Sequence, residues 1–318
     1  MASLTRALIP WGIGLLAFVV SMANALQARV NGAASDYVDH PVIAAMMSVG
    51  GGFVLSALIV LARRDSRVAA RQFLRFQGYA QLKRWQYFAG FGGGIFILGQ
   101  ALVVPGFGVS IYIIAVVAGQ TVASLWVDHI GLGPAGKKAI TLLRVLAAAF
   151  ATIGVVISAL GRGDIPTVAV AAVSFGLAAG AATALQYALN GRIAGATGSA
   201  MLTSALNFFM GFLLLSTILV VTSVVGVWEV TAPPSILERP ELWLGGPLGM
   251  LFIASAAIFV RQLGVLLFAV VSVLGQLAGA ILLDVFAPTP GTELNGLLAL
   301  GLVITTVGVV AASVKRHR

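Results

Sequence analysis

Apolar positions along the chain form ten runs of about the length needed to cross a bilayer, which is roughly 20 residues. The breaks between them contain Gly, Pro or charged residues, which end helices. Two connections are very short and predict tight turns at Pro105–Gly106 and near Arg261. The pattern predicts ten transmembrane helices over residues 9–31, 41–62, 86–104, 107–128, 138–160, 166–190, 198–226, 242–260, 262–284 and 294–314.

The composition leaves few other classes open. The chain has 318 residues, of which 59% are hydrophobic and 9% charged, and its mean hydropathy is +1.04. A soluble domain carries roughly 25% charged residues, so these counts exclude a soluble enzyme, a disordered tail and a nucleic-acid module. The sequence predicts an all-α integral membrane protein. Its net charge of +9 is better explained by cytoplasmic loops, which collect Lys and Arg, than by nucleic acid as a partner.

Basic residues lie mainly on one side of this ten-span arrangement. If both termini are inside, the inner side holds 16 of the 19 basic residues, and the outer side holds only Arg29, Arg162 and Arg239. Of the ten acids, only Asp65 and Asp128 lie inside. The positive-inside rule therefore predicts a multi-pass protein of the bacterial inner (plasma) membrane with cytoplasmic N- and C-termini.

The sequence does not predict a metal or cofactor. It contains no cysteine, and its three histidines (His40, His129 and His317) do not lie deep in an apolar run. Thiolate sites, haem and buried zinc are therefore not expected. There is also no Gly-x4-Gly-Lys-[Ser/Thr] motif for binding a nucleoside triphosphate.

The chain carries an internal repeat. Residues 23–32 align with residues 182–191 at an offset of 159, with six of ten positions identical. The positions Gly108, Gln120 and Asp128 recur at Gly264, Gln276 and Asp284 at an offset of 156. We expect two repeats, 1–160 and 161–318, with five spans each. Because five is odd, the second repeat enters the membrane inverted, which is a transporter architecture.

Several motifs resemble a known family. They are Gln-x3-Asn-Gly in the first run, His40-Pro41 before the second, a Gly-rich third run, and the stretch from Ala118-Gly119-Gln120 to Asp128-His129-x-Gly131. This pattern is similar to the YdcZ family of inner-membrane exporters in the drug/metabolite transporter superfamily. The resemblance implies a ten-helix fold, cytoplasmic ends and movement of small metabolites, and it implies that relatives with a single repeat pair as dimers. With both repeats fused, we expect a monomer or a homodimer.

Two pairs of amides recur with the spacing of one helical turn. Gln27 and Asn31 are four residues apart and share a helix face, and Gln186 and Asn190 repeat the pattern. An amide is costly in lipid unless it is paired. These four side chains therefore either line a substrate cavity or hydrogen-bond between helices.

Two further amides occupy the middle of the fourth and ninth runs. Gln120 and Gln276 each follow a glycine, which allows a neighbouring backbone or a substrate to come close. Midplane polar residues at a repeat interface are where a substrate site is expected. We predict that these two amides and the four above border one central cavity. The alternative is again hydrogen bonding between helices.

Three more polar residues are candidates for gating or coupling. Asp128 and Asp284 close the fourth and ninth runs, and Ser124 continues the Gln120 face. The alternative is that both acids are ordinary interfacial carboxylates. As one of only two acids on the basic inner side, Asp128 is expected to find a basic partner.

The middle of the predicted spans contains neither Asp nor Glu. This argues against proton coupling through a buried acid and against tight binding of a strongly cationic drug. It favours a neutral, zwitterionic or weakly polar solute. The longest inner loop, residues 63–84, carries Arg67, Arg71 and Arg75 on one helical face. It either lies on anionic lipid headgroups or only sets topology.

These features favour a secondary transporter that exports a small polar metabolite or drug-like solute by alternating access, with that solute and membrane lipid as partners. The alternative is a non-transporting assembly or sensor protein that keeps the transporter fold. An enzyme is disfavoured because no cluster of catalytic or metal-ligating side chains is placed at membrane depth.

Overall fold

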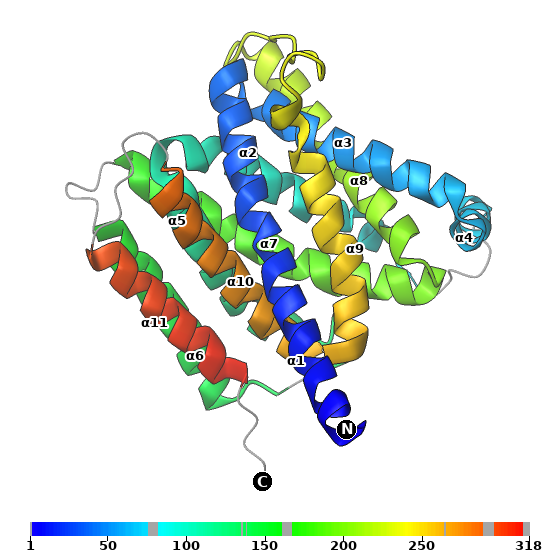
Figure 1. Ribbon diagram of the computed structural model, residues 1–318. Coiled ribbons are helices and arrows are strands. Elements are labelled where there is room, and N and C mark those ends of the chain that lie inside the picture. The colour runs from blue at the N-terminus through cyan, green and yellow to red at the C-terminus, as the bar shows by residue number, and fades with distance from the viewer. Residues whose placement is uncertain are drawn as a thin grey trace.

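The computed structural model describes residues 2–75, 82–134, 136–137, 139–160, 167–263, 265–288 and 296–313. Every regular element in these ranges is a helix (Figure 1). The α-helices are α1 (Ala2–Ser21), α2 (Ala23–Val38), α3 (Pro41–Ala62), α4 (Arg64–Leu74), α5 (Gly90–His129), α6 (Leu142–Leu160), α7 (Thr167–Thr197), α8 (Ala200–Val224), α9 (Gly245–Leu263), α10 (Val265–Phe286) and α11 (Gly296–Ser313). Two short 3-10 helices are η1 (Arg84–Ala89) and η2 (Pro240–Trp243).

The helices follow the predicted runs, with the second run matching α3 residue for residue. The first and sixth predicted runs end too early. Helices α1 and α2 together continue to Val38, beyond residue 31, and α7 continues to Thr197, beyond residue 190. Both extensions pass through a glycine that packs closely on a neighbour. A Cβ at Gly32 would lie 2.8 Å from Val104 Cγ1, and a Cβ at Gly191 would lie 2.9 Å from Pro134 Cγ. Tertiary packing therefore stabilises helix beyond Gly32 and Gly191, where the sequence suggests a helix end.

The tight turn between the third and fourth runs lies at Gly108 and not at Pro105–Gly106 as predicted. Gly108 has φ 81° and ψ 167°, a conformation that is essentially limited to glycine. Pro105 and Gly106 stay helical, and the chain turns two residues after Gly106. The other tight turn is predicted near Arg261. There α9 ends at Leu263 and α10 begins at Val265, and residue 264 lies outside the described ranges. The connections between the fifth and sixth runs (161–164) and between the ninth and tenth runs (289–290) also lie outside these ranges.

Several described segments are long and apolar enough to cross a membrane. They are 12–38, 41–62, 84–129, 170–197 and 200–224, and shorter apolar helices cover 144–158, 271–286 and 296–308. The segment 84–129 has 46 residues. At 1.5 Å per residue it is about twice as long as a 30 Å bilayer core requires, and the Gly108 turn divides it into two passes. The protein is thus an all-α membrane protein with about ten membrane helices.

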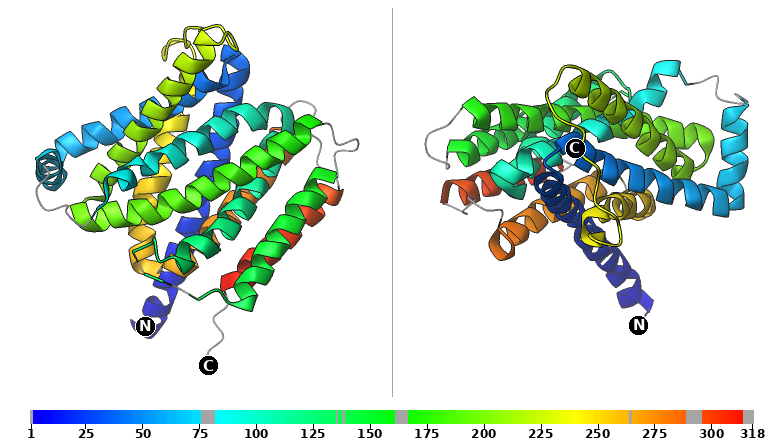
Figure 2. Two further views of the ribbon diagram at one scale, coloured as in Figure 1. Left: turned by 180° about the vertical axis from the view of Figure 1, so that it is seen from behind. Right: turned by 90° about the horizontal axis from the view of Figure 1, so that it is seen from above.

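The helices pack in pairs that are far apart in the sequence. Helix α5 lies along α7, α3 lies along α8, and α6 and α11 form a pair at the edge of the bundle (Figures 1 and 2). The edge pair meets at Gly154 and Gly301, where a Cβ on Gly154 would lie 2.5 Å from the Gly301 carbonyl oxygen. Small residues of this kind let membrane helices approach closely. The start of α1 and the end of α11 both lie toward the lower edge of Figure 1.

The two repeats begin their second helices in the same way. His40 accepts a hydrogen bond from Ile43 N at 3.4 Å, and Ser199 accepts one from Leu202 N at 3.2 Å. Both are N-caps, which satisfy a backbone N–H left free at a helix start. The residues before them, Asp39 and Gly198, have φ 52° and 65°. These positions differ by 159, the offset of the sequence repeat.

Helix crossings between the repeats are also reciprocal. A Cβ at Gly119 on α5 would collide with the Leu177 carbonyl oxygen on α7, and a Cβ at Gly275 on α10 would collide with the Phe18 carbonyl oxygen on α1. Gly119 and Gly275 differ by 156, and Phe18 and Leu177 differ by 159. Such exchanged contacts are those that a two-fold relation between the repeats produces. Each repeat buries its first helix against the other, so we do not expect either repeat to fold alone.

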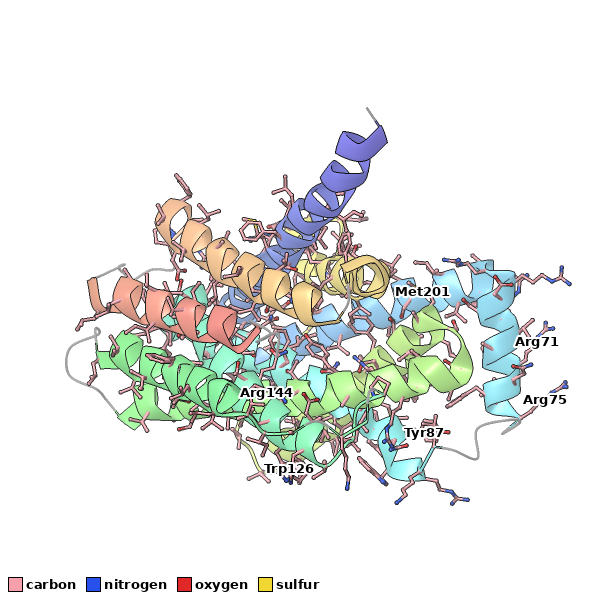
Figure 3. The ribbon with its side chains drawn as sticks, turned by 90° about the horizontal axis from the view of Figure 1, so that it is seen from below. Arg71, Arg75, Tyr87, Trp126, Arg144 and Met201 are labelled. Atoms are coloured by element: carbon pink, nitrogen blue, oxygen red, sulfur yellow. The ribbon has the colours of Figure 1, made fainter. Side chains whose placement is uncertain are left out.

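The loop predicted to lie on the inner side contains the short amphipathic helix α4. Its arginines are exposed, and Figure 3 shows Arg71 and Arg75 directed away from the bundle. Ser66, on the opposite face, is buried and lies 3.3 Å from Ser199 Oγ. Arg67 donates to the Leu61 carbonyl oxygen at the end of α3, at 2.5 Å. Helix α4 is therefore fixed to the bundle on one face and presents a basic face outward.

Lowering the pH is expected to destabilise the protein through His40. This side chain is fully buried and stacks beside Trp228 at a centroid distance of 5.5 Å. Burial lowers the pKa of His40 below 6.5, and a backbone hydrogen bond and the nearby Asp39 only partly offset this. The unfolded chain therefore binds the proton first, so stability is constant well above pH 6.5 and declines as the pH falls from there toward the lowered pKa.

The measurement is the unfolding temperature of the purified protein between pH 8 and pH 5. His40→Asn is the matched variant, because asparagine caps a helix but does not titrate. Wild type should lose stability relative to this variant below about pH 6.5. Parallel curves for the two proteins would contradict the assignment.

Candidate functional site

The first amide pair lies between three helices. Gln27 and Asn31 project from the same face of α2 and are buried. Gln27 Nε2 donates to the Gly245 carbonyl oxygen at the start of α9 at 2.9 Å. Asn31 Nδ2 donates to Gln100 Oε1 on α5 at 2.6 Å. The pair therefore joins the first repeat to the start of α9 in the second.

The second amide pair converges on one acceptor. Gln186 Nε2 and Asn190 Nδ2 on α7 both donate to Asn207 Oδ1 on α8, at 2.9 Å and 3.0 Å. Gln186 and Asn207 are buried, and Asn190 is half-buried. Asn207 is thus the centre of a polar cluster that links the first two helices of the second repeat.

Each glutamine packs on a glycine of the opposite repeat. A Cβ at Gly249 would lie 2.5 Å from Gln27 Nε2, and a Cβ at Gly93 would lie 2.9 Å from Gln186 Nε2. The glutamines differ by 159 and the glycines by 156, as the sequence repeat requires. Gln27 and Gln186 thus occupy equivalent places, both at the contact between the two repeats.

Several buried polar atoms in these clusters lack a hydrogen-bond partner among the described residues. They are Asn31 Oδ1, Gln100 Nε2 and Ser48 Oγ in the first cluster and Asn190 Oδ1 in the second. An unpaired buried polar atom costs about 1–3 kcal/mol, so each site has unused capacity to bind water or a polar solute. All side chains that form the two clusters are amides or hydroxyls, which suits an uncharged or zwitterionic group.

Neither Gln120 nor Gln276 hydrogen-bonds to these pairs in the described part of the chain. Gln276 is buried and donates to Ser272 Oγ on its own helix at 3.2 Å, and Gln120 is half-buried on α5. The backbone carbonyls of Leu177 and Phe18 fill the space beside the glycines that precede these two glutamines. Of the two uses predicted for these glycines, the structure therefore assigns them to helix packing.

The three candidate gating residues lie in different environments. Asp128 Oδ2 accepts from Arg144 Nη2 at 2.5 Å, with both side chains about a quarter exposed. This is the basic partner expected for Asp128. Ser124 Oγ donates to the Thr121 carbonyl oxygen at 2.8 Å, a bond within its own helix.

Asp284 is 6% exposed and accepts from Ser110 N at 2.9 Å and Val109 N at 3.3 Å. It therefore caps the helix that restarts after the Gly108 turn, where an anion is favoured. This binds α10 to the broken end of α5. A buried cap is a different role from an exposed interfacial carboxylate, and Asp284 is the most buried of the three gating candidates.

Two cavities accompany these clusters. One of about 240 Å³ lies between η1, α5 and α7 and includes Trp85, Phe88, Phe91 and Gln186 in its lining. The larger, of about 630 Å³, lies along α3 and is almost wholly apolar. Of the six predicted site amides, Gln186 lines one of these two cavities. A single cavity bordered by all six stays a prediction.

The residues missing from the predicted site are the partners of the amides. Asn207 and Gln100 are polar residues within apolar runs, but their partners cannot be read from spacing. Ser48 gives a weaker signal because serine is common in membrane helices. It could have been found by the repeat, since Ser48 is 159 residues before Asn207. The described residues contain no group of three or more His, Cys, Asp or Glu side chains placed to hold a metal ion.

Comparisons with known proteins give a family and a fold. The family model described as "Putative inner membrane exporter, YdcZ" matches the chain twice, over residues 13–157 and 171–311. A solved structure described only as "Crystal structure of protein" covers 94% of both chains at 18% identity with a TM-score of 0.50, which shows a similar fold alone. Among curated proteins, none matches.

Proposed function

This chain belongs to the YdcZ family of the drug/metabolite transporter superfamily, with two fused repeats, and from this premise we propose that it exports a small polar solute from the cytoplasm by alternating access. Membership in a family of inner-membrane exporters supports transport rather than catalysis. The finer proposal concerns the site, the class of solute and the direction of movement.

The observation that carries the proposal is the pair of equivalent polar clusters at the contact between the repeats. Gln27 meets Gly245 and Gly249 of the second repeat, and Gln186 meets Gly93 of the first. A relative movement of the repeats changes the packing of both glutamines against these glycines together, while the Gln186–Asn207 bond lies within the second repeat. Such exchange between two equivalent arrangements is the basis of alternating access in repeat-built transporters.

The clusters also support a solute class. Amides and hydroxyls bind by donating and accepting hydrogen bonds, and neither cluster supplies a carboxylate or an ammonium group. We therefore propose a neutral or zwitterionic solute with both donors and acceptors. Coupling to protons through a carboxylate within these clusters is disfavoured for the same reason.

The experiment is a metabolite-resolved export assay that compares a strain lacking the gene with the same strain expressing wild type or a single leucine variant. The variants replace the two cluster glutamines (Gln27→Leu and Gln186→Leu) and the two midspan glutamines (Gln120→Leu and Gln276→Leu). If these amides bind the solute, each variant should weaken binding by about 1–3 kcal/mol, or roughly five- to a hundredfold. Among the described residues, the hydrogen bond of the Gln276 amide stays within its own helix, so its loss should leave the unfolding temperature nearly unchanged. Leucine suits the bilayer and is of similar length.

Normal export by all four variants would place the site elsewhere and leave the four glutamines a role in packing. If no metabolite differs between the deletion strain and the complemented strain, while folded protein is present by chromatography, the export proposal is wrong. That result would favour a non-transporting assembly or sensor protein.

The proposed direction depends on the orientation of the chain, which a labelling test can establish. We expect a cysteine at Arg71 to resist an impermeant thiol reagent in intact cells, because α4 should be cytoplasmic by the positive-inside rule. A cysteine at Glu238 should label, because it belongs to the predicted outer loop. The chain has no native cysteine, so the background is low. Labelling at Arg71 without labelling at Glu238 would invert the proposed topology.

A further inference from the structure

An apolar groove of about 630 Å³ runs along α3 from Ile43 to Leu58. Its other walls are α8, the start of α9 at Pro247, and the segment between α8 and α9 that contains Trp243. In Figure 1, α3, α8 and α9 lie together, with the α8–α9 segment above them. The volume lies within the range of about 300–1,000 Å³ that holds a small ligand.

The polar groups of this groove are already satisfied by the backbone. Trp243 Nε1 donates to the Pro234 carbonyl oxygen at 3.2 Å, and Thr231 Oγ1 donates to the Val38 carbonyl oxygen at 3.1 Å. The remaining lining residues are Ile, Leu, Val, Met, Phe, Gly and Pro. A polar solute would lose its hydrogen bonds to water here and gain few in return. The groove is therefore suited to a hydrocarbon chain.

The first polar cluster lies directly behind one wall of this groove. Met47 and Gly51 line the groove, while Ser48, between them in sequence, belongs to the cluster. A Cβ at Gly246 would lie 2.7 Å from the Ser48 carbonyl oxygen and 2.5 Å from Gly52 N. The wall at this point is thus the bare backbone of α9 against the bare backbone of α3.

Unpaired polar atoms face this same wall. A Cβ at Gly245 would lie 2.6 Å from Ser48 Oγ and would collide with Asn31 Oδ1. Both of these oxygen atoms are buried and lack a partner among the described residues, as does Gln100 Nε2 beside Asn31. The cluster therefore offers acceptors at the α3–α9 contact that borders the groove, and a donor beside Asn31.

We propose that the solute is an uncharged amphiphile whose alkyl chain occupies the α3 groove and whose hydrogen-bonding head binds Asn31, Ser48 and Gln100. This inference rests on the proposed export function and specifies its substrate class. A head with hydroxyl or amide groups matches the free donor and acceptors, and the groove takes a chain that enters sideways from the bilayer.

The start of α9 separates the apolar groove from the first polar cluster, so it must move before one solute can occupy both. Gln27 holds it by donating to the Gly245 carbonyl oxygen, and the glycines at the contact leave no side chains to repack. Withdrawal of Gly245 and Gly246 from α3 opens the groove to the cluster. Gln27 thus has a positioning role, as the bond that closes the wall.

The test uses the intact protein in lipid nanodiscs and a dodecyl glucoside that carries two bromine atoms on its chain. Bromine quenches tryptophan fluorescence on contact, and Trp243 lines the groove. We expect a saturable quenching component in wild type that is absent in Trp243→Phe. Quenching by probe dissolved in the bilayer is unsaturable and is common to both proteins. Methyl glucoside, which is the head alone, should compete at least about tenfold more weakly than unlabelled dodecyl glucoside.

Matched variants distinguish binding of the probe's alkyl chain from binding of its head group. Gly51→Leu should fill the groove and weaken the saturable component about tenfold or more, because Gly51 lines the groove and its Cβ has room (3.8 Å to Gly246 Cα). Ala149→Leu, on an exposed face of α6, is the control and should leave it unchanged. Ser48→Ala should weaken it several-fold by removing a head contact.

The outcomes distinguish this inference from the proposed function. Unsaturable quenching that is equal in wild type, Trp243→Phe and Gly51→Leu would overturn the amphiphile assignment, even if the metabolite assay detects export. Saturable, Trp243-dependent quenching without any export would support the binding site and overturn the transport proposal instead.

Discussion

Replacing Gly119 by alanine is expected to destabilise the protein more than most single substitutions. Its Cβ would collide with the carbonyl oxygen of Leu177, and both atoms belong to helix backbones that cannot move independently. Overpacking of this kind typically costs about 1–3 kcal/mol and sometimes more. Gly275→Ala, at the equivalent crossing with Phe18, should have a similar effect.

The measurement is the fraction of purified protein that elutes as a single species, together with its unfolding temperature. Gly106→Ala is the matched control, because it lies on the same helix with no atom within 4 Å of its Cβ position. It should be neutral or slightly stabilising, since alanine favours the helix by up to about 1 kcal/mol. If Gly119→Ala behaves like this control, the α5–α7 crossing described above is incorrect.

Substituting Asp284 by alanine is expected to cost more stability than the same change at Asp128, although the two acids are equivalent in the repeat. Removing the Asp284 carboxylate leaves Val109 N and Ser110 N without their acceptor inside the protein. Such loss costs about 1–3 kcal/mol. Asp128 pairs with Arg144 where both side chains are about a quarter exposed, and such pairs contribute about 0–1 kcal/mol.

Unfolding temperatures of Asp284→Ala, Asp284→Asn and Asp128→Ala measure this difference. Asparagine keeps one acceptor oxygen and caps helices well, so Asp284→Asn should recover part of the loss. Equal effects of the two alanine variants would mean that the carboxylate does not cap the helix after Gly108. In that event Asp284 would have no special role as a buried cap among the gating candidates.

The repeat explains why much of the architecture could be predicted. Residues 23–32 and 182–191 share an offset with the caps His40 and Ser199 and with the cluster residues Ser48 and Asn207. Sequence equivalence therefore led to structural equivalence, even where the residue types differ. Serine and histidine both cap a helix because each offers an acceptor to a free backbone N–H.

The partners of the amides could not be predicted from the same pattern. Spacing places Gln27 and Asn31 on one helix face, but it does not say whether that face meets Gly245, Gln100 or open space. Gln120 and Gln276 are equivalent in sequence, yet only Gln276 is fully buried. The burial of a side chain depends on which other helix packs over it. That helix is distant in sequence, so spacing along the chain does not identify it.

The sequence by itself determined that this is a membrane protein, that it is all-helical, where its spans approximately lie and that it contains two repeats. These follow from hydropathy and periodicity, which act locally because every backbone group in a bilayer must be satisfied within its own helix. Tertiary structure alone decided that the chain turns at Gly108 and that Asp284 caps the helix beyond it. It also decided that Asn31 and Ser48 keep free oxygens behind an apolar groove. These are contacts between segments up to 175 residues apart, and close packing of complementary surfaces sets them.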